Sequence, residues 1–130
     1  MTEMEIRQGL TALGLRTGDV VLIHSSVAHM GQIEGGVDAL LKAFLAVVGE
    51  KGTVVVPAFG DLGIFTRAVR QHPRAVISDS PKGTVAAIGD QAEFICRAHC
   101  AAATAHGYNT PYLKIADLGG YVCLLGVDQD

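Results

Sequence analysis

A histidine and two serines directly follow the first strongly apolar stretch of the chain. His24, Ser25 and Ser26 come after four consecutive apolar residues at positions 20–23. A run without alternation is typical of a strand covered on both faces, and ligands of open α/β sheets bind beyond the carboxyl ends of such strands. We interpret the three residues as candidate ligand contacts; the alternative is a cluster that only caps and positions a loop.

A pair of glycines opens the clearest helix in the sequence. Gly35 and Gly36 precede apolar residues at helical spacing, at positions 37, 40, 41, 44, 45 and 48, and Gly49 follows them. The free N–H groups and the dipole of a helix N-terminus favour an anion. With the hydroxyls at 25 and 26, this start predicts a phosphate-binding loop, although it has neither the Walker A nor the G-x-G-x-x-G pattern. An ordinary turn before a helix remains the alternative.

Two further polar segments contain residue types suited to catalysis or anion binding. The first, at 80–84, holds Lys82, and the second contains His99, His106 and Tyr108. A lysine there either contacts a phosphate or is merely solvated, whereas a histidine can act as a general base near neutral pH. Because the H-E-x-x-H and G-x-S-x-G patterns are both missing, neither a metal site nor an α/β-hydrolase nucleophile is predicted.

The elements that position these residues begin as a helix followed by a strand–helix–strand unit. Thr2 and Glu5 have the spacing of a capping box, which predicts a helix that ends near Gly14. Strands are predicted over 20–23 and 53–56, with the glycine-initiated helix of residues 37–48 between them. Such a βαβ crossover favours two parallel strands in a sheet covered by helices.

The rest of the chain has a weaker pattern. We predict a short helix over 62–71, a short strand over 75–77, a helix over 91–99 and one or two helical turns over 111–117, and leave 83–88 undecided. A buried strand is predicted over 121–127. The fold class is therefore α/β: a three-layer-like mixed, largely parallel sheet with covering helices, in one domain spanning 1–130.

Composition excludes several classes of protein. The 130 residues are 49% hydrophobic and 18% charged, with a formal net charge of −3, which argues against disorder and against a nucleic-acid partner. No apolar run is long enough for a membrane span, and the acidic N-terminus lacks the apolar core of a signal peptide, so a cytoplasmic protein is expected. Cys96, Cys100 and Cys123 lack metal-type spacing and are expected to be reduced, mostly buried thiols.

Taken in order along the chain, these segments resemble the aminoglycoside 3-N-acetyltransferase family. Residues 18–26 (GDVVLIHSS), the glycine pair at 35–36 and residues 48–57 match its GD-hydrophobic-HSS strand, GG helix and VG-x-x-GT-hydrophobic-P strand. Residues 85–89 (VAAIG), 107–112 (GYNTPY) and 122–127 (VCLLGV) are similar to its S-V-A-A-x-G, YG-x-x-SP and V-x-L-L-G segments. The collinear order over nearly the whole chain makes the resemblance specific.

The resemblance implies transfer of an acetyl group from acetyl-coenzyme A to the 3-amino group of an aminoglycoside or a related amino sugar. It places His24, Ser25, Ser26, Gly35 and Gly36 at the coenzyme site. Thr84 stands where the family usually has a serine that also faces the coenzyme. The expected partners are therefore acetyl-CoA and a small amino sugar, with no metal, membrane or nucleic acid.

The sequence also departs from the family pattern. Family members are longer in the middle, and their general-base histidine lies in a T-x-x-H-x-x-E stretch after the V-x-L-L-G strand, which has no counterpart before Asp130. The resemblance thus implies a shortened form, in which His24 and His99 are the substitute bases to consider. The alternatives are a coenzyme A-binding, catalytically inactive fragment or partner subunit, and a remnant that folds poorly. An exposed last strand would further favour a homodimer.

Overall fold

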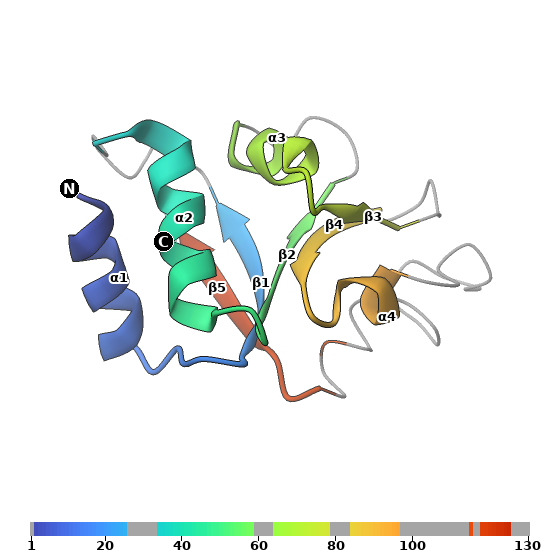
Figure 1. Cartoon of the computed structure of the whole chain (residues 1–130), viewed down its shortest axis with the longest axis horizontal. Helices are drawn as coiled ribbons and strands as arrows, with labels where there is room; N and C mark the ends of the chain where they lie inside the picture. Colours follow the sequence, from blue (N-terminus) through green and yellow to red (C-terminus); the bar gives the residue numbers. More distant parts are fainter. Residues whose placement is uncertain are drawn as a thin grey trace, which may run out of the picture.

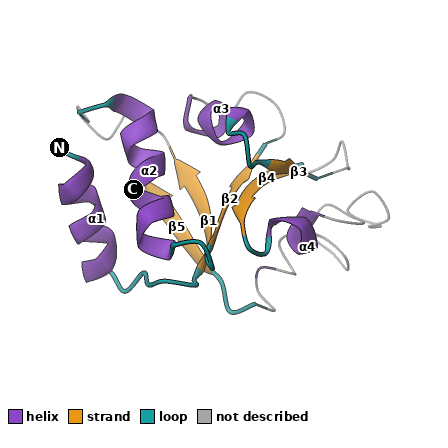
Figure 2. Cartoon of the chain, in the orientation of Figure 1, coloured by secondary structure: helices purple, strands orange, loops and turns teal. Residues whose placement is uncertain are grey.

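The computed structural model describes residues 2–25, 34–58, 64–78, 84–96, 115 and 118–125, which form one sheet with helices on both faces (Figure 1). In chain order the elements are α1 (Glu3–Ala12), β1 (Val20–Ser25), α2 (Gly36–Val48), β2 (Thr53–Pro57), α3 (Ile64–Gln71), β3 (Val76–Ile77), β4 (Val85–Gly89), α4 (Ala92–Cys96) and β5 (Tyr121–Leu125). Figure 2 shows the helices packed around the strands.

The sheet has the strand order β3-β4-β2-β1-β5 and is mixed. The pairings of β1 with β2 and with β5 are parallel, and the pairings of β4 with β2 and with β3 are antiparallel. The predicted βαβ unit and the mixed α/β fold are therefore confirmed. Residues 85–88, in the segment left undecided from the sequence, belong to β4. They are buried, and β4 has a neighbouring strand on each side.

The two long helices begin and end at the residues that the sequence indicated. Thr2 caps α1: its Oγ1 accepts from the N–H of Glu5 at 3.2 Å, and the Glu5 carboxylate accepts from the N–H of Thr2 at 3.0 Å. This capping box satisfies two backbone donors at once. Helix α2 is followed by the C-cap residue Gly49, whose φ of 69° lies in the left-handed region that a residue with a side chain rarely adopts.

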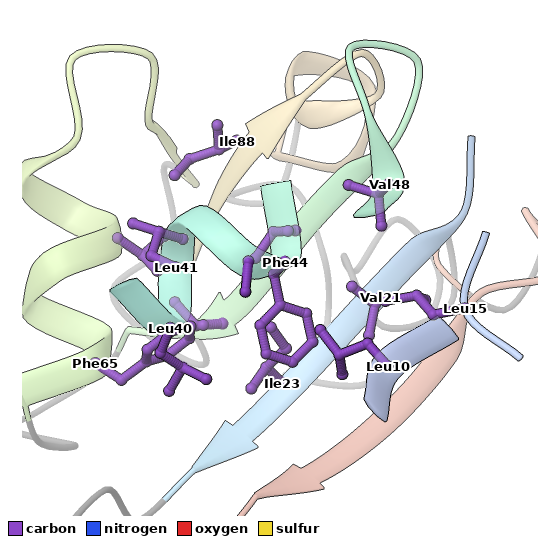
Figure 3. Packing of buried hydrophobic residues seen from close by; sticks show 14 of the residues in the cluster. Leu10, Leu15, Val21, Ile23, Leu40, Leu41, Phe44, Val48, Phe65 and Ile88 are labelled. Carbon is purple, nitrogen blue, oxygen red and sulfur yellow. The ribbon is translucent and has the colours of Figure 1, made fainter. Parts of the chain in front are cut away.

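Two hydrophobic clusters lie on opposite faces of the sheet. The larger one joins α1, α2 and α3 to one face, and Phe44 of α2 lies at its centre, fully buried, with its ring centroid 6.3 Å from that of Phe65 (Figure 3). The smaller one joins α4 and Ile115 to the other face. Because Val21 and Ile23 face the first cluster while Val20 and Leu22 face the second, β1 is covered on both sides.

Strand β5 differs from its predicted burial. It lies at the end of the described sheet and pairs with β1 through one edge, while Tyr121 is 53% and Val122 is 62% exposed. The expectation of a buried strand over 121–127 was therefore wrong on this point. A run of apolar residues specifies a strand, but the neighbours that cover it are set by the topology.

In the described part of the chain, no helix is long and apolar enough to cross a membrane.

Candidate functional site

The predicted site residues that the structure describes lie at one edge of the sheet. His24 and Ser25 are the last two residues of β1, at its carboxyl end. At the opposite end of β1, the N–H of Gly18 donates to the carbonyl of Val48, the last residue of α2, at 2.8 Å. Since α2 runs back along β1, its first turn, at Gly35 and Gly36, belongs to the carboxyl edge of the strand.

Strand register brings Thr84 to the same edge. Leu22 of β1 pairs with Val55 of β2, so Pro57 stands level with His24 two residues further along the parallel pair. Pro57 in turn pairs with Val85 of antiparallel β4, and the N–H of the next residue, Ala58, donates to the carbonyl of Thr84 at 2.7 Å. Thr84 is half-buried at this corner of the sheet. The edge thus combines the ends of β1 and β2, the start of β4 and the start of α2.

The start of α2 has the features of an anion-binding turn. Gly35 and Gly36 have φ angles of 84° and 65°, in the region that favours glycine, and no side chain in the described part of the chain hydrogen-bonds the first turn as a cap. A Cβ added to Gly35 would lie 3.0 Å from the Cβ of Ala39, so a side chain at position 35 would be crowded by the helix that follows. The first N–H groups of a helix have no partner within the helix and favour an anion, whereas Asp38 adds a negative charge to the same turn.

Helix α3 fixes the edge from one side. The hydroxyl of Thr66 donates to the carbonyl of Pro57 at 3.4 Å, and the guanidinium of Arg70 donates to the carbonyl of Ala58 at 3.3 Å. Together with the bond from Ala58 to Thr84, these contacts hold the end of β2 and the approach to β4 in one arrangement. Sequence reasoning missed both residues: the helix was predicted, but nothing in its pattern indicated which carbonyls it would contact.

The structure brings some of the predicted residues together and does not place others. Backbone positions at 24, 25, 35, 36 and 84 share the edge, whereas Ser26 and the segments holding Lys82, Cys100, His99, His106 and Tyr108 lie outside the described residues. Cys96 is buried and Cys123 partly so, and both are reduced. Among the described residues, no group of three His, Cys, Asp or Glu side chains is placed to hold a metal ion.

Comparison with known proteins identifies similar sequences and folds. The family model described as Aminoglycoside 3-N-acetyltransferase matches residues 22–61 and 58–130. Aminoglycoside N(3)-acetyltransferase VII of Streptomyces paromomycinus is 29% identical over 97% of this chain, and the chain spans 56% of that protein. The chain thus spans a little over half the length of this curated relative.

Solved structures show the same fold. The structure of AAC(3)-IVa in complex with apramycin matches 100% of this chain and 58% of its own, at 29% identity and a TM-score of 0.89. The binary complex of AAC-IIIb with CoASH matches 95% of this chain and 59% of its own, at 23% identity and a TM-score of 0.90. With a family match that covers most of the sequence, the chain belongs to the aminoglycoside 3-N-acetyltransferase family.

Proposed function

We propose that this chain forms the coenzyme A-binding part of an N-acetyltransferase that acts on the 3-amino group of an aminoglycoside or a related amino sugar. The observation that carries the proposal is the convergence of the β1 end, the first turn of α2 and Thr84 at one edge of the sheet. Membership of the family supports the reaction class, and a family fold solved with CoASH supports the coenzyme.

The residues at this edge fit a phosphorylated coenzyme. The first turn of α2 offers backbone N–H donors that no described side chain caps, and glycines at 35 and 36 leave room for a ligand close to the backbone. In the sequence, Ser25 and Ser26 directly follow the apolar run that forms β1, and we propose that their hydroxyls also contact the coenzyme. We assign the phosphates to these groups and a polar contact with the coenzyme to Thr84.

In the proposed reaction, bound acetyl-CoA supplies a thioester whose acetyl carbon is transferred to the substrate amine. The amine nitrogen forms the new N–C bond, the C–S bond breaks, and a base takes the proton that the amine releases. Donors fixed at the sheet edge would stabilise the negative charge that develops on the thioester oxygen. Among the described residues, His24 is the histidine at this edge and is the candidate for the base.

Thermal unfolding of the purified chain with coenzyme A tests the binding step. A ligand that binds only the folded state raises the melting temperature, by an amount equivalent to about 2.7 kcal/mol at a hundredfold excess over its Kd. We expect the double change Ser25→Ala and Ser26→Ala to remove most of this rise. Thr11→Ala, on the exposed side of α1, is the control that should keep it. An unchanged melting temperature at millimolar coenzyme A would contradict the proposal.

A second candidate function is coenzyme A binding without acetyl transfer, as an inactive chain or a partner subunit. Coenzyme binding needs only the groups gathered at the sheet edge, whereas acetyl transfer also needs a base. The two candidates differ in thiol release from acetyl-CoA in the presence of an aminoglycoside. Because general-base assistance is worth roughly 10²–10⁴-fold, the second candidate predicts a rate lower than that of the full-length relative by at least that range. Comparable rates would eliminate it.

A further inference from the structure

A buried serine closes the sheet edge on the side away from β1. Ser78 directly follows β3 and is 6% exposed. Its N–H donates to the carbonyl of Val85 at 2.9 Å, and its hydroxyl oxygen accepts from the N–H of Val85 at 3.0 Å. The register of β3 against β4, in which Ile77 stands opposite Ala86, puts Ser78 opposite Val85. Ser78 thus pairs with the first residue of β4 through its backbone and through its side chain.

The peptide group between Thr84 and Val85 is held at both of its ends. Its N–H, which belongs to Val85, donates to the Ser78 hydroxyl, and its carbonyl, which belongs to Thr84, accepts from the N–H of Ala58 at 2.7 Å. The first bond comes from the β3 side and the second from the β2 side, since successive groups of a strand bond to opposite neighbours. Because a peptide group is planar, the two bonds together fix its orientation and hence the direction of Thr84.

The hydroxyl of Ser78 is required for this arrangement. Val85 is 0% exposed, so without the hydroxyl its N–H would lose this acceptor in a buried position. An unpaired buried donor is costly, and the peptide group would shift toward another acceptor. Such a shift would move the Thr84 carbonyl away from Ala58 and turn the Thr84 side chain, which belongs to the candidate site.

We infer that Ser78 is a positioning residue for the coenzyme site. It acts through the peptide group that joins Thr84 to Val85 and sets the direction in which Thr84 faces the coenzyme. Strands β4 and β2 lie between β3 and β1 (Figure 1), so Ser78 acts through Thr84 and not by contact with the groups at the end of β1. The inference rests on the proposed function in one respect, the contact between Thr84 and the coenzyme.

Titration calorimetry of the purified chain with coenzyme A tests this inference. Ser78→Ala should raise the Kd roughly two- to tenfold, the change that loss of one hydrogen bond produces, and Thr84→Val should raise it by a similar factor. The double variant should bind no more weakly than Thr84→Val alone, because Ser78 has nothing to position once the Thr84 hydroxyl is gone. Ser78→Thr keeps the hydroxyl and should bind like the wild type.

Thr53→Val is the matched control for a general loss of stability. Thr53 is another buried residue whose hydroxyl accepts from a backbone N–H, at the opposite end of β2 from Ala58. Its replacement should lower the melting temperature but leave the Kd unchanged. Amide hydrogen exchange adds a readout without coenzyme. Ser78→Ala should speed exchange of the Ala58 N–H several-fold and leave that of the Asp90 N–H, which donates to the Gly52 carbonyl beyond the other end of β4, unchanged.

Several results would overturn the inference and leave the proposed function intact. They are a wild-type Kd in Ser78→Ala, an equal increase of the Kd in Thr53→Val or in Ser78→Thr, and a double variant in which the two separate increases multiply. Unchanged exchange of the Ala58 N–H in Ser78→Ala would overturn it whether or not coenzyme A binds. A wild-type chain that does not bind coenzyme A would instead overturn the proposed function, and this inference with it.

Discussion

The hydroxyl oxygen of Thr53 accepts a hydrogen bond from the backbone N–H of Gln91 at 2.9 Å, across 38 positions of sequence. Thr53 is the first residue of β2 and is fully buried, and Gln91 lies in the turn that leads from β4 into α4. The bond satisfies a backbone donor where the chain leaves the sheet to cross to its other face.

Removal of that hydroxyl should destabilise the protein. Thr53→Val keeps the branched shape but leaves the Gln91 N–H without this acceptor, and we expect a loss of about 1–3 kcal/mol in the free energy of unfolding. Thr53→Ser keeps the oxygen and should lose clearly less. Urea unfolding of the three proteins measures both values. Equal stability of Thr53→Val and the wild type would show that the bond contributes nothing.

Glycine is required where β4 ends. A Cβ on Gly89 would collide with the carbonyl oxygen of Gly52, and its φ of 134° is unfavourable for other residues. We expect Gly89→Ala to lose at least about 1–3 kcal/mol, the usual range for an overpacked site. The control is Gly9→Ala in α1, where no atom lies within 4 Å of the added Cβ. That variant should gain about 0.5–1 kcal/mol, so the two substitutions should shift the melting temperature in opposite directions.

The ring of Phe44 is central to the larger hydrophobic cluster. Phe44 is 0% exposed and packs against Phe65, so Phe44→Ala should cost about 3–5 kcal/mol. Met4 on α1 is 54% exposed, and Met4→Ala should change stability by less than about 0.5 kcal/mol. Chemical denaturation of both variants, with the slope m compared, is the measurement. A Phe44→Ala protein as stable as Met4→Ala would contradict the packing described for this cluster.

The capping box makes α1 sensitive to acid. The hydrogen bonds from the backbone and side chain of Thr2 lower the pKa of Glu5 in the folded state. The ionised Glu5 carboxylate therefore stabilises the folded protein fully above the ordinary pKa of a glutamate, and this contribution is lost as the pH falls through the lowered pKa. Thr2→Ala should cost about 1 kcal/mol at neutral pH and should weaken this dependence. The free energy of unfolding of both proteins is measured between pH 7 and pH 3. A parallel loss of stability in the two would contradict this role of Glu5.

Arg70 should control the mobility of the candidate site. Its guanidinium contacts the carbonyl of Ala58, whose N–H is bonded to Thr84. Arg70→Met removes the first bond, so the Ala58 amide should exchange its hydrogen several-fold faster, and the Tm rise given by coenzyme A should decrease. Arg74→Met, also on the surface, is the control with an unchanged Ala58 rate. Unaltered exchange in Arg70→Met would show that α3 does not fix the edge.

Several helices and strands could be predicted from their own residues. The capping residue Thr2, the glycine at 49 and the unbroken apolar runs of β1 and β2 each determine an element from its own residues. They could not determine that β4 pairs antiparallel with β2, because that pairing joins Thr53 to Gly89 through contacts distant in sequence. The exposure of Val122 depends on the same long-range order of strands.

Part of the candidate site could likewise be predicted from the sequence, and part could not. The position of His24 after a buried strand and of Gly36 at a helix start was predictable, because a βαβ crossover puts both at one edge. The contribution of Arg70 was not, since an arginine on a helix is usually a solvated charge and only its contact with the Ala58 carbonyl reveals its position. The grouping of Thr84 with these residues followed from the resemblance to a family, not from spacing.

The position of β5 next to β1 also affects the order in which the chain acquires structure during synthesis. Val21 pairs with Tyr121, so one edge of β1 stays without its partner until the last described strand has left the ribosome. Closing so long a loop is entropically costly, whereas the β1–α2–β2 unit joins residues much nearer in sequence. The nascent chain should therefore form that unit first and dock β5 last, with the apolar edge of β1 open in the interval. We expect chaperones to bind the nascent chain mainly during this interval.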